Sequence, residues 1–204
     1  TLILDIIDSR VEQKFINFIT KNNFKHFFSN KYFEVLLNSS NLRKVKNVEN
    51  LAKSTQVFNE FRKNNITFAP LKGINLFYKE PSLKTRNLSD VDVLVKEEDL
   101  PKAILICKNN GFDTKIWEDY LPKKHTIYSN PNLVHSNKLA QLDIHTTVFR
   151  DNEKANELFF KNILLDKNKI ILNNEILLLH LIYHGTTKDS FNVGPIFIMD
   201  LIFL

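Results

Sequence analysis

With 204 residues, of which 43% are hydrophobic, the chain is long enough to bury one sizeable core, and this composition excludes an intrinsically disordered protein. Its 28 basic and 23 acidic residues are interspersed, so the net charge of +5 is compatible with nucleotide or nucleic-acid partners but indicates no basic binding face. The single cysteine, Cys107, excludes an internal disulfide and a cysteine-based zinc site, and it suits a reducing cytoplasm.

The first 65 residues have the apolar spacing of helices. Asparagine-rich stretches near Asn22 and at residues 38–41 predict breaks between these helices. The phenylalanines of this part are interpreted as helix-packing side chains rather than as a base-stacking platform, and the basic cluster at 43–46 as a solvated face rather than an RNA-binding groove. We therefore expect a helical N-terminal section over residues 1–65.

The middle of the chain alternates between strand and helix patterns. Residues 66–70 predict a short strand, residues 74–78 a helix, and the β-branched run 91–95 a second strand. An acidic turn and Pro101 begin a helix that ends near Gly111. Further short strands are expected at 112–117, 125–129 and 139–145.

The last part returns to helical patterns, with helices expected at 153–160, 175–184 and 195–204. Strands in the middle and helices at both ends predict an α+β fold with sections 1–65, 66–150 and 151–204. Every apolar stretch falls well short of the roughly 20 residues that span a bilayer, so no membrane segment is expected. Because the sequence stops inside an apolar run, we expect a fragment of a longer chain.

The first candidate for chemistry is the carboxylate pair Asp90 and Asp92. Residues two apart in a strand point to the same face, about 7 Å from each other. Two like charges placed in this way repel each other unless a cation lies between them, and carboxylate oxygens suit Mg²⁺. The same pattern is also typical of a strand start or a turn, so the pair alone leaves both readings open.

Three neighbouring features favour the chemical reading. Gly73, between a strand and a helix, permits close approach of phosphate to the backbone, and Lys72 adds a cation. Arg86 is able to fork onto a phosphate. Asp143 and His145 share one face of a strand, where a third carboxylate would complete a two-metal site. The alternatives are a turn glycine with two surface cations, and a His145 that is simply a hydrogen-bonded strand residue.

The remaining histidines give weaker signals. His125 and His135 flank a predicted hairpin, where surface or turn placement is favoured over a place in the cleft. His180 and His184 lie four apart on a helix, as two zinc ligands do, but no glutamate follows His180. A metalloprotease is therefore disfavoured, and helix packing or a role at the edge of the site is preferred.

Taken in order, these motifs resemble the uncharacterised nucleotidyltransferases of the DNA polymerase β-like superfamily. The resemblance extends from Ile66 to His184. It is carried by Pro70-Leu-Lys72-Gly73, Tyr78, Arg86-Asn-Leu-Ser-Asp90-Val-Asp92-Val-Leu-Val95, Asn110-Gly111-Phe112, Leu142-Asp143-Ile144-His145 and Leu177-Leu-Leu-His180-Leu-Ile-Tyr-His184.

The resemblance implies a mixed β-sheet nucleotidyltransferase core flanked by helices. It makes Gly73 the glycine of a triphosphate-binding loop, Asp90 and Asp92 ligands of a divalent metal, and Asp143 the third carboxylate ligand. Superfamily members commonly have Gly-Ser or Gly-Gly in the loop, whereas this chain has Lys72-Gly73-Ile74 and therefore no loop hydroxyl.

The implied reaction is attack by an acceptor hydroxyl on the α-phosphorus of a nucleoside triphosphate such as ATP, with Mg²⁺ or Mn²⁺ bound and pyrophosphate leaving. Asp143 would accept the proton, and Lys72 and Arg86 would offset the charge of the triphosphate, with His145 beside them. A protein side chain, a tRNA end and a small molecule each suit the superfamily as acceptor, and a toxin or defence system is one context. The alternatives are a catalytically silent relative that binds nucleotide or protein, and an unrelated helper protein.

Overall fold

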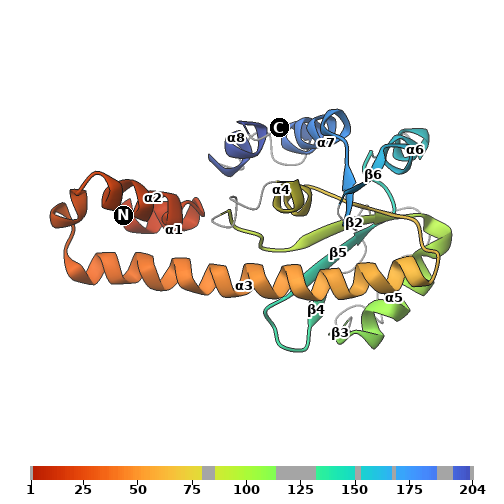
Figure 1. Cartoon of the computed structure of the whole chain (residues 1–204), viewed down its shortest axis with the longest axis horizontal. Helices are drawn as coiled ribbons and strands as arrows, with labels where there is room; N and C mark the ends of the chain where they lie inside the picture. The colour runs from red at the N-terminus through yellow and green to blue at the C-terminus, as the bar shows by residue number, and fades with distance from the viewer. Residues whose placement is uncertain are drawn as a thin grey trace.

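The computed structural model describes residues 2–79, 86–113, 132–149, 153–166, 169–187 and 195–202. A mixed five-stranded sheet forms the centre, with helices at both ends of the chain, so the predicted α+β class is confirmed (Figure 1). The helices are α1 (Leu2–Asp8), α2 (Glu12–Lys21), α3 (Asn30–Lys63), α4 (Gly73–Lys79), α5 (Leu100–Asn109), α6 (Glu153–Lys161), α7 (Asn174–Thr187) and α8 (Pro195–Ile202), with short 3-10 helices η1 (Phe24–Phe27) and η3 (Glu97–Asp99). The strands are β1 (Phe68–Pro70), β2 (Val91–Val95), β3 (Phe112–Asp113), β4 (Asn132–His135), β5 (Gln141–His145), β6 (Ile163–Asp166) and β7 (Lys169–Leu172).

The strand order of the sheet is β1-β2-β5-β4-β3. The central strands β2 and β5 run parallel, and the other neighbours are antiparallel. The parallel register places Asp92 opposite Asp143 and Leu94 opposite His145. Because side chains that face each other across neighbouring strands point to the same side, these four residues share one face of the sheet.

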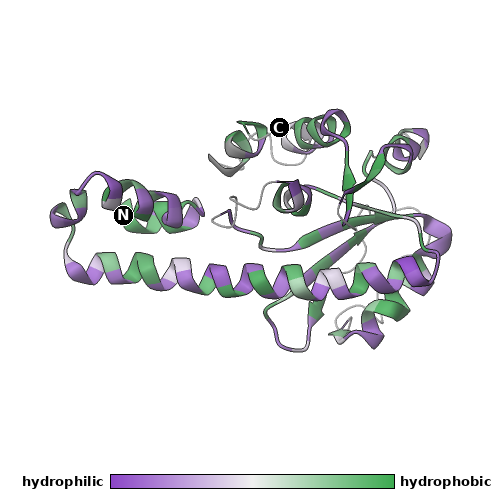
Figure 2. Ribbon diagram, in the orientation of Figure 1, coloured by the Kyte–Doolittle hydropathy of each residue, from purple (hydrophilic) through white to green (hydrophobic). Residues whose placement is uncertain are grey.

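Two hydrophobic cores lie on the two faces. Helices α3 and α5 cover one face and bury Phe61, Cys107 and the valines of β2. Helices α6 and α7 pack on the other face around Leu94 and Leu181. The short helix α4 contributes side chains to both cores. Figure 2 shows hydrophobic and hydrophilic positions alternating along α3, as expected for a helix with one buried side.

The N-terminal helices form a separate cluster around the first half of α3, where Ile19 and Leu36 are almost completely buried (Figure 1). The break predicted near Asn22 is confirmed, because α2 ends at Lys21. The break predicted at residues 38–41 is wrong, because α3 continues through them. Serines have weak helix propensity, but Ser39 and its neighbour Ser40 face α2 and donate hydrogen bonds to side chains there, which satisfies their hydroxyls within the helix.

The C-terminal section is not entirely helical as predicted, because β6 and β7 form an antiparallel hairpin between α6 and α7. Strand β4 was not predicted either. The expected strand at 125–129, most of that at 112–117 and His125 lie outside the described residues. The division at residues 65 and 150 stays a prediction. In the described part of the chain no helix is both long and apolar enough to cross a membrane.

Candidate active site

Asp92 is the centre of the polar cluster on the α7 side of the sheet. It is 4% exposed, and its Oδ1 accepts hydrogen bonds from Lys72 Nζ at 2.9 Å and, in one tautomer, from His145 Nε2 at 2.8 Å. Burial opposes ionisation, but the charge of Lys72 and the contact with His145 outweigh it and hold the pKa of Asp92 well below its ordinary value. Asp92 is therefore a permanent carboxylate at physiological pH.

Lys72 is brought to Asp92 by an unusual backbone. Its φ of 51° lies in the left-handed region, which costs a non-glycine residue on the order of 1 kcal/mol. The preceding residue, Leu71, donates its N–H to Asp92 O at 2.9 Å, so both this backbone hydrogen bond and the ion pair of Lys72 fix the loop after β1 to β2. Burial lowers the pKa of Lys72, but Asp92 and then Asp90 and Asp143 raise it to a greater extent, so the ammonium stays charged.

The three predicted carboxylates are near each other, but each has different partners. Asp90 Oδ1 accepts a hydrogen bond from Ser89 Oγ at 2.8 Å. Asp143 Oδ1 is buried and has no hydrogen-bond partner among the described residues. Burial, followed by the charges of Asp92 and Asp90, raises the pKa of Asp143 to about 6. A carboxylate with an unmatched buried oxygen, next to two further carboxylates, is the part of the site with the greatest need for a cation.

The donor set fits a divalent metal by its chemistry, because Mg²⁺ and Mn²⁺ prefer carboxylate oxygens and Asp143 Oδ1 has no other partner. The described residues contain no ready-made group of three or more His, Cys, Asp or Glu side chains that would hold a metal ion. Lys72 supplies positive charge beside Asp92 instead. Asp90, Asp92 and Asp143 are the residues that would hold such a metal.

Arg86 and Gly73 meet at the beginning of α4. Arg86 is 8% exposed; its Nε and Nη2 donate to both carboxylate oxygens of Asp200 in α8, and its Nη1 donates to Asn87 O at 2.8 Å. A Cβ at residue 73 would lie 2.3 Å from Arg86 Nη1, so glycine is needed to make room for the guanidinium. The phosphate-binding roles expected of both residues stay predictions, since this contact explains the glycine without a phosphate.

Sequence reasoning missed Asp200. The signal for it was a lone carboxylate in the apolar run 196–204, because such a residue, when buried, needs a cationic partner. It also missed Asn47 and Asn50 of α3, which are buried and hold the backbone before Asp90. Asn47 Nδ2 donates to Arg86 O, and Asn50 Nδ2 donates to Leu88 O, each at 2.7 Å. Two asparagines three apart inside a helical pattern were the available signal.

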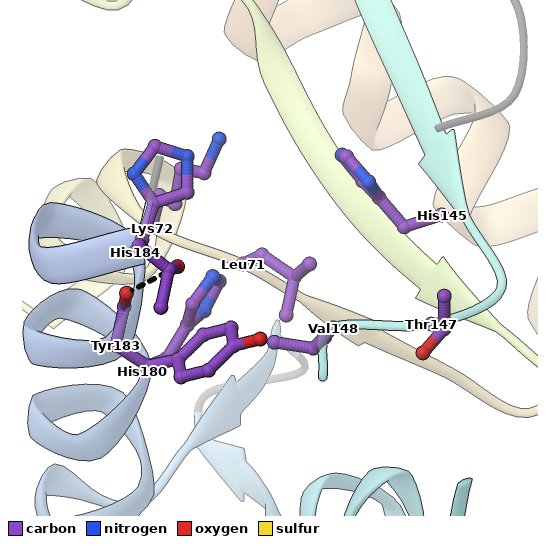
Figure 3. Close-up of a pocket in the computed structure, with 9 residues that line it drawn as sticks. Leu71, Lys72, His145, Thr147, Val148, His180, Tyr183 and His184 are labelled. Carbon is purple, nitrogen blue, oxygen red and sulfur yellow. Dashed lines mark hydrogen bonds between the residues drawn. The ribbon is translucent and has the colours of Figure 1, made fainter. Parts of the chain in front are cut away.

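A small pocket lies next to this cluster, between α7, Leu71 and the end of β5 (Figure 3). Lys72 and His145 line it on the carboxylate side, and His180 and Tyr183 line it on the α7 side. His180 is 2% exposed and packs against Phe159, and in the part of the chain that the structure describes its Nδ1 has no hydrogen-bond partner. Burial, together with the charge of Lys72, lowers the pKa of His180 well below its ordinary value, so the ring is neutral.

The other histidines follow their sequence interpretation. His184 lines the same pocket, and no described residues form a zinc cluster with it or with His180. His135 lies against Phe112 at the β3–β4 edge and accepts a hydrogen bond from Asn137 N at 3.2 Å, which is the structural placement that was favoured. The edge-of-site role of the α7 histidines is thus consistent with their position.

Comparison with known proteins matches the chain to a protein family. A family model described as uncharacterised nucleotidyltransferase covers residues 6–204. No curated protein and no solved structure matches the chain. The match extends from α1 to the end of the chain and includes the whole of the sheet with its acidic cluster.

Proposed function

We propose that this chain, which belongs to the family of uncharacterised nucleotidyltransferases, transfers a nucleoside monophosphate from a nucleoside triphosphate to an acceptor hydroxyl and releases pyrophosphate. Membership of the family supports nucleotidyl transfer in general. The observation that best supports the specific reaction is the pairing of Asp92 with Asp143 on adjacent parallel strands, beside Lys72. A protein side chain, a tRNA end or a small molecule is the proposed acceptor.

Asp90, Asp92 and Asp143 would hold Mg²⁺ or Mn²⁺ in this proposal. When bound, such an ion supplies Lewis-acid stabilisation of phosphoryl oxygens. Lys72 has a charge that suits the same substrate, because its ammonium, which pairs with Asp92, would lie beside the phosphate oxygens of a triphosphate held at these carboxylates. The site then offsets the negative charge of both the carboxylates and the triphosphate.

Asp143 is the best placed group to accept a proton. Its Oδ1 has no hydrogen-bond partner among the described residues, so this oxygen would be free to take the proton of an acceptor hydroxyl. The acceptor oxygen then forms a bond to the α-phosphorus, the bond to the bridging oxygen of the β-phosphate breaks, and its electron pair leaves with pyrophosphate. Lys72 stabilises the charge that develops on the phosphate oxygens.

A catalytically silent relative is the second candidate function. The observation that favours it is that Asp92 Oδ1 is already matched by Lys72 and His145, while no preformed metal cluster exists among the described residues. Such a protein would bind nucleoside triphosphate through Lys72 without transferring any part of it. Binding and transfer must therefore be measured separately.

The deciding experiment incubates the protein with each α-labelled nucleoside triphosphate, Mg²⁺ or Mn²⁺ and a cell extract, and then locates the label. We expect label on an acceptor with the wild type and none with Asp92→Ala. Asp8→Ala, at an exposed position of α1, is the matched control and should label as the wild type does. Equal labelling by the wild type and Asp92→Ala, or no nucleotide binding in calorimetry with metal present, would refute the proposal.

A further inference from the structure

We infer that the tip of the N-terminal helical cluster, residues 18–32, docks on an anionic lipid surface by inserting exposed phenylalanine rings between the lipid headgroups. The tip consists of the end of α2, the short helix η1 and the first turn of α3. It lies at one end of the long axis of the molecule (Figure 1). The inference goes beyond the proposed function and does not depend on it, because it uses no residue of the acidic cluster.

Three phenylalanine rings of the tip are exposed and adjacent to one another. Phe18, Phe24 and Phe27 are 56%, 40% and 72% exposed. The ring centroids of Phe18 and Phe24 are 6.0 Å apart, and those of Phe24 and Phe27 are also 6.0 Å apart. The sequence-based interpretation of helix-packing side chains suits Phe15 and Phe28, which pack in the N-terminal core, but not these three. A contiguous exposed aromatic surface of this kind marks an interaction site.

The charged side chains of the tip all have the same sign. Lys21, Lys25 and Lys31 are exposed, and residues 13–33 contain no aspartate or glutamate. Lys31 lies in the first turn of α3, where the helix dipole disfavours a positive charge, and this turn contains no acidic residue. Helix stability therefore does not account for this lysine, whereas an anionic partner does. Charge complementarity thus indicates a negatively charged surface.

A lipid surface suits this combination better than a protein or a nucleic acid does. Lysine is depleted in the centre of protein interfaces, whereas phenylalanine together with lysine is typical of segments that lie on anionic membranes. There the lysine stems lie along the apolar boundary and the ammonium groups reach the headgroups. The exposed rings are tilted by 61° and 59° from one another, so they do not offer parallel faces to successive bases.

The backbone of the tip is fixed by local contacts before any partner binds. Asn23 has a φ of 58°, in the left-handed region that asparagine tolerates, and it connects α2 to η1. Phe28 packs edge to face on Phe15, with ring centroids 5.6 Å apart. Ser29 Oγ then accepts a hydrogen bond from Tyr32 N at 3.4 Å at the beginning of α3. The exposed rings are therefore presented without the entropic cost of ordering a loop.

The tip is also remote from the acidic cluster. Asn47, which donates a hydrogen bond to the backbone before Asp90, lies roughly 25 Å further along α3 than Asn30 at the tip. A lipid surface that contacts the tip is therefore separated from the acidic cluster by the first half of α3.

The test is sedimentation of the chain with vesicles made of equal parts of phosphatidylcholine and phosphatidylglycerol, and with vesicles of phosphatidylcholine alone. We expect binding to the anionic vesicles that weakens as the salt concentration rises, and far weaker binding to the neutral vesicles. Lys31→Gln should weaken binding about fivefold, which corresponds to the loss of one lysine at an anionic surface. Lys44→Gln, at an exposed position further along α3, is the matched charge control and should bind as the wild type does.

The aromatic contribution is tested at Phe27. Phe27→Ser should weaken binding about tenfold and leave the melting temperature unchanged, because this side chain is 72% exposed. Phe27→Trp should retain binding, and the emission of the added tryptophan should shift to shorter wavelengths with anionic vesicles as the indole leaves water. Leu42→Ser and Leu42→Trp are the matched controls and should show neither change, since Leu42 is 65% exposed but lies outside the tip.

Equal binding to both kinds of vesicle, no binding to either, or binding that Lys31→Gln and Phe27→Ser leave unchanged would overturn the inference. Binding of a fluorescent single-stranded oligonucleotide that falls in Phe27→Ser, with no binding to vesicles, would also overturn it and would assign the tip to nucleic acid. A chain that binds anionic vesicles through the tip but labels no acceptor would refute the proposed function and leave the docking surface intact.

Discussion

The two faces of strands β2 and β5 have the same backbone and opposite chemistry. On the face toward α3 and α5, Val91, Val93 and Ile144 are apolar and at most 1% exposed. On the face toward α7 lie Asp92 of β2 and Asp143 of β5, which are opposite each other in the parallel register. The period of two in a strand thus lets one face supply stability while the other carries the groups for chemistry.

The two faces also differ in whether their buried atoms need hydrogen-bond partners and have them. Apolar side chains on the α3 side need no partners, whereas the α7 side contains Asp143 Oδ1 and, beyond it, His180 Nδ1, both buried and unbonded. Buried polar atoms without partners lower the free energy of unfolding. The α7 face is therefore less stable than it would be with these atoms bonded, and the predictions below compare substitutions by their effects on transfer and on stability.

The largest effect is expected for Asp143→Asn. It removes the proposed proton acceptor, so transfer should fall by about 10²–10⁴-fold in the labelling assay. Circular dichroism should show the same fold, since the substitution keeps the shape of the side chain. The neighbouring Ile144→Val, on the opposite face, is the control and should transfer at the wild-type rate per folded molecule. A full rate in Asp143→Asn would exclude this residue from the reaction.

Ile144→Ala should have the opposite effects: it should lower stability and leave nucleotide binding unchanged. Ile144 is completely buried in the core on the α3 side, so its truncation should lower the free energy of unfolding by about 2–5 kcal/mol in urea titrations. Nucleotide affinity of the remaining folded protein should stay unchanged. A loss of affinity comparable to the loss of stability would show that the two faces are not independent.

Gly73→Ala should have a smaller effect, on the order of 1–3 kcal/mol in unfolding free energy, because its Cβ would overlap the Arg86 guanidinium. The guanidinium is held by Asp200 and has little room to move. In an Arg86→Ala background the same substitution should cost almost nothing further, which a double-mutant cycle measures. Additive effects of the two substitutions on the free energy of unfolding would mean that the glycine is needed for a reason other than the guanidinium, such as the close approach of a phosphate.

The smallest effect concerns pH in the metal-free protein. The pKa of Asp143 is raised from 3.8 to about 6, so the folded state binds its proton more tightly than the unfolded state does. This contribution to stability is complete below pH about 4 and is lost as the pH rises through about 6. Buried His180, whose pKa is lowered, contributes the opposite trend in both proteins, so the prediction concerns their difference: the melting temperature of the wild type relative to that of Asp143→Asn should fall as the pH rises from about 4 to about 6. A difference that does not change with pH would exclude Asp143 as the origin of this trend.

Much of the fold was predictable because its signals are local. The valines of β2 and the asparagine that ends α2 were recognised from neighbouring residues alone. Strand β4 and the β6–β7 hairpin were missed because a short apolar run such as 163–166 has no period that distinguishes it from a helix segment. The helix break expected at 38–41 is absent because hydrogen bonds to α2, which is far away in the sequence, override the local helix propensity.

The sequence supplied candidate residues for the site but not the pairings between them. The resemblance to the nucleotidyltransferase family, now confirmed, named the three carboxylates and Lys72. The register that places Asp92 opposite Asp143 depends on which strands become neighbours, and no local pattern contains that information. The partner of Arg86 was missed for the same reason, since Asp200 lies 114 residues further along the chain.

The two buried asparagines of α3 have a consequence for how this protein can vary. The side-chain oxygen of Asn47 accepts a hydrogen bond from the N–H of Leu88, and that of Asn50 accepts one from the N–H of Gln141. Both amides also donate to backbone carbonyls of the segment before Asp90. The two side chains therefore bond this backbone as the peptide groups of a neighbouring strand would. An α-helix turns by about 100° per residue, so one inserted residue between Asn50 and the buried Val57 would rotate both amides away from that segment. We expect relatives of this chain to tolerate insertions of whole helical turns in α3 far better than insertions of one residue.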